Sequence, residues 1–400
     1  MCSVAVSPDP DEDRAYTSHH YVPQWYQRRF LEPGSTQNML QVLHLQPALV
    51  KDSSGRQHTL PAQRRRAISR CFTTDDLYTL RLGPARSTAI EQHLFGEIDR
   101  RGASAVEYWA SFCHPSFDRS AFRALLRYMS TQKLRTPKGL AWLAQELGTN
   151  SANRTLRAMV EYQTLFASIW TEAVWQIVDA SQSPTKFLLT DHPVTVYNRM
   201  LGPRNRQCRP PNDPDIRMQA SHTLFPLGLD KILILTNLSW ARNPYRNPTQ
   251  LRPNPAFFRD AHVNFFDIHT GRSLSEAEVR QINFILKSRA YTCVAAAKAE
   301  WLYPEEYVSK SDWNTYGNGH LLMPDPRGLH PVATMTLQYS DGSTFSYDDY
   351  GRLPSHPDFG KDDQPLRGPS SLGTFQAEFE VLVGPELRGA PYMVEGRFRT

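Results

Sequence analysis

The stretch SHHYVPQWYQRRF, residues 18–30, decides where the folded domain begins. Pro23 is acceptable in the first turn of a helix, where its missing N–H has no partner to lose. Helical spacing relates the apolar positions that follow, which are Trp25, Tyr26, Phe30 and Leu31. The pattern predicts a helix from Pro23, with His19 and His20 at or just before its N-terminus. A neutral imidazole at that position serves as a base, a metal ligand or a hydrogen-bonding group.

Outside this stretch the composition is that of a globular chain with ample core. Of its 400 residues 40% are hydrophobic and 11% aromatic, which suits one large domain or two ordinary ones. Its five cysteines are far apart and form no Cys-x-x-Cys pair, so they indicate neither a zinc knuckle nor a disulfide framework. No apolar run reaches the ~18 residues of a membrane span. We therefore expect a cytoplasmic protein without a membrane partner, and the oligomeric state stays open.

A formal net charge of +5 is modest, but one segment concentrates positive charge. Residues 199–209 contain no acid and four arginines, which are Arg199, Arg204, Arg206 and Arg209. Such a loop attracts phosphate groups, so nucleic acid is a candidate partner. The alternative is a solvated loop that only aids solubility.

Helices are expected in the middle of the chain and strands on either side. Residues 1–17 are acidic and predict a disordered leader. Alternation predicts a strand over residues 39–45 and a second over 72–80. Helical spacing covers residues 90–112 and 122–129, and the second helix stops before Pro137.

Further along, one helical stripe gives way to strands. Apolar residues at helical spacing over 159–177 predict a long buried helix. Short strands are expected at residues 187–190, 224–227 and 231–236. Ser275 and Glu278 match a capping box and predict the start of another helix.

The last part of the chain has a different pattern. Residues 335–347 alternate around Asp341-Gly342, which predicts a hairpin, and residues 375–381 form another alternating segment. We divide the chain into the leader 1–17, a domain over 18–300, a linker over 301–329 and a β-rich module over 330–400. The predicted fold class is α+β, with a mainly helical core, small sheets and this β-rich module.

Several of these segments together resemble the DUF4238 family, whose name assigns no function. The similar segments are His20-Tyr21-Val22-Pro23-Gln24, Ile90-Glu91, Gln132-Lys133-Leu134-Arg135-Thr136-Pro137, Thr190-Asp191-His192-Pro193-Val194, Phe225-Pro226-Leu227 and Asn283. The order of these segments and their spread over residues 18–300 identify the family more specifically than any single segment does. The chain departs from the family at His192, where members usually have asparagine, so the role of that position is open.

The polar residues of these segments suggest one kind of chemistry. His20 precedes a helix, Glu91 lies on a helix, and Asp191 directly follows a short buried strand. One imidazole and two carboxylates suffice to bind a divalent cation, which activates water for phosphodiester hydrolysis. His20, Glu91 and Asp191 are therefore the candidate catalytic and metal-binding residues.

Other polar residues of the segments are candidates for binding the substrate. They are Gln24, Gln132, Arg135 and Asn283, with Arg135 as a phosphate clamp and the arginines of 199–209 as an outer attractor.

A structural interpretation explains the same residues one at a time. Asp191 is suited to hold the turn before Pro193. Arg135 and Glu91 are suited to form an ion pair between helices. Gln24 and Asn283 are suited to satisfy buried backbone groups.

Two functions therefore stay open from the sequence. The first is a metal-dependent phosphoesterase acting on nucleic acid, with a divalent cation as its cofactor. The alternative is a non-catalytic protein that binds a ligand or a partner.

Overall fold

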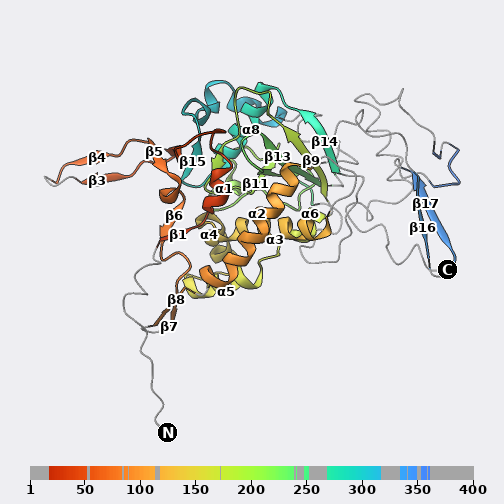
Figure 1. Ribbon diagram of the computed structural model, residues 1–400, viewed down its shortest axis with the longest axis horizontal. Coiled ribbons are helices and arrows are strands. Elements are labelled where there is room, and N and C mark those ends of the chain that lie inside the picture. The colour runs from red at the N-terminus through yellow and green to blue at the C-terminus, as the bar shows by residue number, and fades with distance from the viewer. Residues whose placement is uncertain are drawn as a thin grey trace, which may run out of the picture.

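The computed structural model describes residues 18–51, 55–82, 85–88, 90–112, 118–171, 173–237, 240, 247–251, 268–316, 334–339, 341–348, 353–357 and 359–360. Figure 1 shows a central body in which helices lie along one side of a sheet and helix α8 lies on the other side. The expected α+β fold is confirmed. No helix in the described part of the chain is long and apolar enough to cross a membrane.

A five-stranded sheet forms the centre of the body. Its order is β11-β12-β13-β9-β14, with bounds Thr195–Asn198, Ser221–Pro226, Lys231–Asn237, Ala173–Asp179 and Ile268–Ser273. All neighbours are antiparallel except β14 and β9. Strands β12 and β13 confirm the two strands expected at 224–227 and 231–236. Strand β9 is buried along most of its length, because neighbours flank it on both sides and helices cover it.

The single long helix expected over 159–177 is wrong. Helix α5 ends at Glu161, residues 162–166 form a turn, the short helix α6 spans Ala167–Thr171, and strand β9 begins at Ala173. The run Ala-Val-Trp-Gln-Ile-Val is rich in β-branched and aromatic residues. Such residues favour a pleated surface, and the pairing of β9 with β13 outweighs the helical spacing of the stripe.

Helices α2 to α5 form the layer that carries the pocket described below. They span Gly96–Ala110, Arg119–Arg135, Pro137–Glu146 and Ala152–Glu161, and the π-helical turn Ile90–Phe95 precedes α2. A Cβ at Gly102 would lie 2.6 Å from the ring of Tyr128, so glycine permits the close packing of α2 on α3. Trp109 packs against Trp175 of the sheet, which fixes the layer on the central strands.

A second sheet, of order β10-β15-β2-β5, lies beside the first. Its strands span Leu189–Thr190, Cys293–Ala296, Met39–His44 and Gln63–Ala67. Helix α8, Glu276–Arg289, leads into β15, and the capping box of Ser275 and Glu278 is present as expected. The strand β2 confirms the strand expected at 39–45.

The opening stretch connects these parts. Strand β1, Ser18–His20, pairs with β6, Thr73–Asp75, and helix α1 spans Gln24–Arg28. The ring of Tyr26 stacks on Phe225 of the central sheet with centroids 5.5 Å apart, and its hydroxyl donates to the carbonyl of Pro226. The expected helix after Pro23 is therefore real but short, and aromatic packing holds it.

Three two-stranded ribbons account for the remaining strands among the described residues. They are β3–β4, Leu49–Lys51 with Gln57–Thr59; β7–β8, Leu80–Leu82 with Ala85–Ser87; and β16–β17, Thr334–Gln338 with Thr344–Asp348. The last ribbon confirms the hairpin expected around Asp341-Gly342. The leader 1–17 and the segment 375–381 lie outside the described residues.

The boundary between the domain and the expected linker stays a prediction. Short 3-10 turns at Glu300–Leu302, Pro304–Glu306 and Lys310–Thr315 follow strand β15. Trp301, Leu302 and Trp313 from these turns are buried in the core. The first part of the segment 301–329 thus packs on the body.

Candidate functional site

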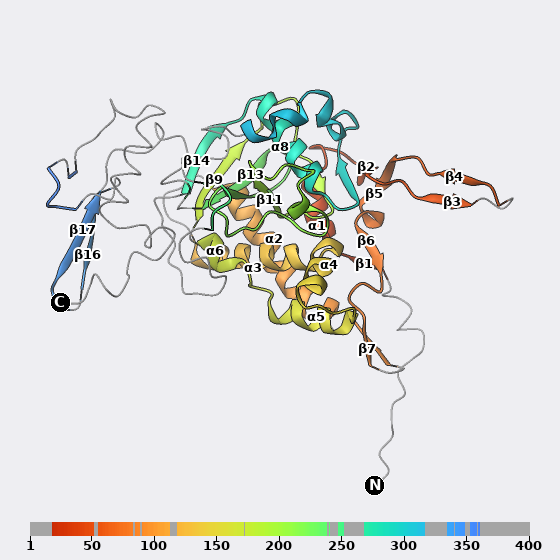
Figure 2. The same ribbon diagram turned by 180° about the vertical axis from the view of Figure 1, so that it is seen from behind.

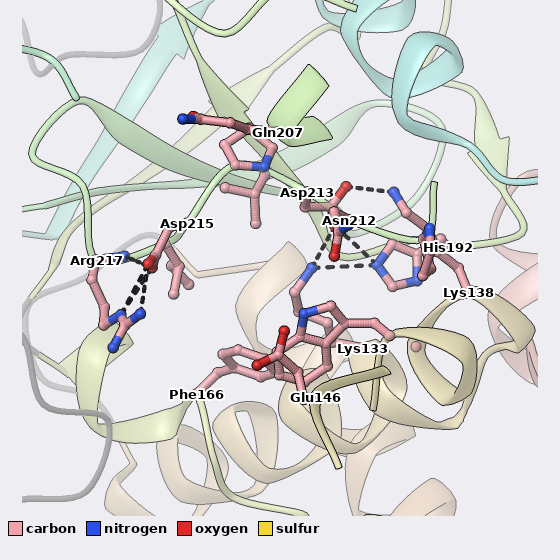
Figure 3. Close-up of a pocket in the computed structure, with 16 residues that line it drawn as sticks. Lys133, Lys138, Glu146, Phe166, His192, Gln207, Asn212, Asp213, Asp215 and Arg217 are labelled. Carbon is pink, nitrogen blue, oxygen red and sulfur yellow. Dashed lines mark hydrogen bonds and ion pairs between the residues drawn. The ribbon is translucent and has the colours of Figure 1, made fainter. Parts of the chain in front are cut away.

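A pocket opens where the junction of α3 and α4 faces the chain segment 207–217. Its volume is about 220 Å³. Figure 3 shows polar and charged side chains converging on it from both walls, and the labelled ones include Lys133, Lys138, His192 and Asp213. The pocket therefore lies between segments that are far apart in the sequence.

A tight corner brings the two lysines together. Pro137 starts α4 directly after α3 ends, and Thr136 caps α4 by accepting a hydrogen bond from the Gly139 N–H. A Cβ at Gly139 would lie 2.1 Å from the carbonyl oxygen of Lys133, so only glycine fits against the end of α3. The corner places Lys133 at the end of one helix and Lys138 at the start of the next.

Both lysines share one carboxylate, that of Asp213. Lys133 Nζ lies 2.8 Å from Asp213 Oδ2, and Lys138 Nζ donates to Oδ1 of the same group. Lys138 also donates to the Arg289 carbonyl at 2.8 Å. Burial alone would raise the pKa of Asp213, but the two lysines hold it well below its usual range. Burial lowers the pKa of Lys138, and Asp213 opposes that effect.

His192 lies beside this group and is neutral. Its Nε2 atom is 3.3 Å from Lys133 Nζ and 3.3 Å from Asp213 Oδ2, and its Nδ1 atom is 2.7 Å from the Thr136 hydroxyl oxygen. Burial, and then the charge of Lys133, lowers the pKa of His192 to about 3. The imidazole thus adds hydrogen bonds and no charge.

The hydroxyl of Thr136, the imidazole of His192 and the carboxylate of Asp213 follow the order of a nucleophilic triad. The hydroxyl, however, is not accessible enough to act as the nucleophile. Thr136 is 0% exposed, does not line the pocket, and uses its oxygen to cap α4. A nucleophile must reach its substrate. We therefore assign Thr136 to positioning the corner and the imidazole.

Positive charge exceeds negative charge at this place. Arg289 is 3% exposed, and its charge further lowers the pKa of the nearby Lys138. Among the described residues, Asp213 is the only carboxylate that forms ion pairs with Lys133, Lys138 or Arg289. Buried charge without a partner is costly, so this group favours a further anion.

The remaining walls differ in character. Trp142 and Phe166 form an aromatic wall with ring centroids 5.9 Å apart. Asp215 and Arg217 also line the pocket and pair with each other at 2.7 Å. The lining of the pocket thus has three parts: the cationic side chains of Lys133 and Lys138, the aromatic pair Trp142 and Phe166, and the ion pair of Asp215 and Arg217 (Figure 3).

Asp191, one of the predicted catalytic residues, is buried next to the pocket but does not line it. Its Oδ1 accepts from the Tyr291 N–H at 2.8 Å. Its Oδ2 accepts from the Thr292 N–H, from the Thr292 hydroxyl at 2.7 Å and from the Cys293 N–H at 3.1 Å. Both oxygens therefore hold the turn between α8 and β15.

Arg135 and Gln132 form a chain of buried hydrogen bonds. Arg135 Nε donates to Gln132 Oε1 at 2.7 Å, and Gln132 Nε2 donates to the Tyr21 carbonyl at 2.8 Å. Arg135 forms its ion pair with Asp99 at 2.9 Å, whereas a pair with Glu91 was the structural interpretation of the sequence. The expected partner was wrong, because Asp99 on α2 faces the end of α3 directly.

His20 and Glu91 each have one buried side-chain atom that makes no hydrogen bond with the described chain. His20 Nε2 and Glu91 Oε2 are buried, and neither makes a hydrogen bond with the rest of the described chain. Burial lowers the pKa of His20 and raises the pKa of Glu91 to about 7, the latter against the opposing charge of Arg135.

The other predicted binding residues lie elsewhere. Asn283 accepts from the Leu188 N–H at 3.0 Å and donates to the Lys186 carbonyl at 2.8 Å, which ties α8 to the chain before β10. Gln24 is half-buried at the start of α1.

A shared metal site for His20, Glu91 and Asp191 stays a prediction. Among the described residues, no group of three His, Cys, Asp or Glu side chains is arranged to hold a metal ion. None of the three lines the pocket.

The basic segment does reach the pocket. Arg204, Arg206 and Arg209 are exposed, Arg199 is half-buried, and Gln207 and Pro211 from the same stretch of chain line the pocket. The sequence did not lead us to predict Lys133, Lys138 or Asp213 as site residues. Lys133 lies in the segment 132–137 that resembles the family, so the sequence held a signal for it. Nothing in the local sequence marks Asp213.

Fold and pocket define this chain as an α+β protein. Its pocket lies at the corner between two helices and is lined by buried cationic side chains. A family model covers residues 18–300, and the chain belongs to that family, DUF4238, described as a protein of unknown function. No curated protein and no solved structure matches the chain.

Proposed function

We propose that this protein binds a small ligand with an anionic group, such as a phosphate or a carboxylate, in the pocket beside Lys133 and Lys138. One observation carries the proposal. Two buried lysines share a single carboxylate beside a neutral histidine, so the group has room for one more negative charge. Charge-assisted hydrogen bonds to an ammonium group are strong when the site excludes water.

The walls of the pocket narrow the kind of ligand. Trp142 and Phe166 suit an aromatic or apolar portion attached to the anion. The exposed arginines of 204–209 adjoin the residues that line the pocket, and their charge raises the local concentration of anions.

Thermal unfolding with added ligand tests the proposal. Inorganic phosphate and phenyl phosphate are the probes, and the proteins are the wild type, Lys133→Met and the control Lys186→Met. Lys186 is a partly buried lysine paired with Asp230, away from the pocket. Lys133→Met leaves Asp213 paired with Lys138, and circular dichroism checks that the variant is folded.

Ligand at 100 times its Kd stabilises the folded state by about 2.7 kcal/mol. We expect the Tm of the wild type and of Lys186→Met to rise, more with phenyl phosphate, and that of Lys133→Met to stay constant. An equal rise in Lys133→Met, or no rise in the wild type with either probe, would contradict the proposal.

The second candidate is the metal-dependent phosphoesterase acting on nucleic acid that the sequence suggested. The observation in its favour is that His20 Nε2 and Glu91 Oε2 are buried without partners, and both atoms are metal-ligand types. Hydrolysis of bis(p-nitrophenyl) phosphate with Mg²⁺, Mn²⁺ or Zn²⁺ tests it. Activity that is lost with a chelator and in folded His20→Ala and Glu91→Gln would support it. The cytoplasmic location stays a prediction.

A further inference from the structure

A two-stranded arm extends from the second sheet. The ladder of β2 and β5 continues through the bonds from His44 N–H to the Ala62 carbonyl, at 2.8 Å, and from Leu60 N–H to the Ala48 carbonyl, at 2.9 Å. It ends in the ribbon of β3 and β4. Figures 1 and 2 both show this ribbon projecting away from the body.

The arm buries almost nothing of its own. Leu49 is 70% exposed, and Lys51 and all three residues of β4 are exposed as well. A two-stranded hairpin without a packed face is at best marginally stable in water. A partner that lies along the arm would bury what the fold leaves uncovered.

Its charge indicates the chemistry of that partner. Residues 33–72, which include the arm and strand β5, contain six lysines and arginines and one aspartate, which together equal the net charge of the whole chain, +5. The remaining 360 residues are neutral in sum. This region is therefore a second basic part of the chain, beside the arginine-rich segment 199–209.

Strand β5 places three of the arginines along a sheet edge. In the described part of the chain, the sheet order gives β5 the single neighbour β2. Arg64 lies opposite Val42 and Arg66 opposite Leu40, so these two arginines share one face and Arg65 points to the other. Arg65 binds the Gln37 side-chain amide, and neither Arg64 nor Arg66 has an ion pair with a described carboxylate.

The charges of Arg64 and Arg66 act on a neighbouring histidine. His44 of β2 is half-buried, and burial and then the charges of Arg66 and Arg64 lower its pKa. Arg70, at the end of the 3-10 turn Ile68–Arg70 that follows β5, is exposed. Arg70 therefore adds a fourth arginine next to the three of β5.

We propose that the arm and strand β5 bind the phosphate backbone of duplex DNA. A two-stranded β-ribbon fits the major groove of B-form DNA, whereas the major groove of an RNA duplex is too deep and narrow for it. Arg65 is exposed, and neither Arg64 nor Arg66 has an ion pair with a described carboxylate, so these arginines suit contacts with phosphate groups. A second copy of the chain is a poorer occupant, because arginines on an edge strand oppose pairing with an identical strand.

Fluorescence anisotropy with the full chain tests this proposal. The probes are a labelled 20-bp DNA duplex and an RNA duplex of the same sequence, each measured over a series of salt concentrations. The variant is Arg64→Gln/Arg65→Gln/Arg66→Gln. The control is Arg100→Gln/Arg123→Gln/Arg157→Gln, which removes the same charge from exposed positions on helices α2, α3 and α5. Circular dichroism checks that both variants are folded.

Counterion release predicts a slope of log K against log salt of about −0.9 for each phosphate contacted. We expect the β5 variant to bind DNA at least ~10-fold more weakly and to lose about 2 to 3 from that slope, while the control matches the wild type. Equal losses in variant and control would overturn the proposal, as would absence of DNA binding in the wild type or RNA binding as tight as DNA binding. Phosphate binding in the pocket is measured separately, so failure here leaves that proposal standing.

Discussion

The Nδ1 atom of His192 lies 2.7 Å from the hydroxyl oxygen of Thr136, and this contact joins the corner of α3 and α4 to the chain that leaves strand β10. Both residues belong to segments that resemble the family, 132–137 and 190–194. Two segments more than fifty residues apart thus form one wall of the pocket.

The pH dependence of stability is the first prediction. Because the pKa of His192 falls from 6.5 in the unfolded chain to about 3 in the folded one, folding favours the neutral imidazole. The stability from this group is complete above pH 6.5 and falls as the pH drops toward 3, by roughly 1.4 kcal/mol per pH unit. Urea unfolding from pH 7 to pH 4 measures it.

His192→Asn is the comparison for that measurement. Asparagine keeps hydrogen bonding to Thr136 but does not titrate, so its stability curve should be flatter by about one proton between pH 6 and pH 4. Asp213, whose pKa is lowered, acts in the same direction but only in more acidic solution. Parallel curves for the two proteins would mean that the pKa of His192 is the same in the folded and the unfolded chain, and would contradict the prediction.

Asp191 should be needed for stability. Its carboxylate accepts four hydrogen bonds from residues 291–293, and the side chain is 2% exposed. Asp191→Ala leaves those donors unsatisfied and should cost about 3 kcal/mol or more, with Asp191→Asn in between. Chemical denaturation measures the loss. An Asp191→Ala protein of wild-type stability that lost a cation-dependent activity would instead favour the metal site.

Arg135 and Asp99 should be strongly coupled. Arg135 is 1% exposed, pairs with Asp99 at 2.9 Å and lies over the Phe95 ring at 5.0 Å from its centroid. Arg135→Met leaves a buried carboxylate without its partner and should cost about 3–5 kcal/mol. Asp99→Asn/Arg135→Met should recover part of this loss, and a double-mutant cycle measures the coupling. Additive losses in that cycle would refute it.

Glu91 should oppose stability in alkaline solution. Burial raises its pKa from 4.5 to about 7, so the folded state favours the protonated carboxyl. The stability from this group is lost as the pH rises from about 4.5 through 7. Glu91→Gln should therefore gain up to about 2 kcal/mol on the wild type between pH 5 and pH 8, after allowance for partial exposure. Unfolding at both pH values checks this, and a constant difference would count against it.

Local signals in the sequence predicted the elements whose stability is local. The capping box at Ser275, the stop before Pro137 and the alternation at 39–45 each depend on neighbouring residues, and the structure has all three elements. The family resemblance also placed His192 and the 132–137 segment among the residues of interest.

Tertiary structure decided what depends on distant neighbours. Strand β9 follows helical spacing in sequence, yet pairing with β13 and β14 makes it a strand. Lys133, Lys138 and Asp213 meet only because the corner at Gly139 faces residues 207–217, and Asp191 has its role only because residues 291–293 lie against it. The class of fold and the local elements could be predicted from the sequence, because caps and periodicity act over a few residues. Which charges share a buried site could not, because a charge finds its partner through space and not along the chain.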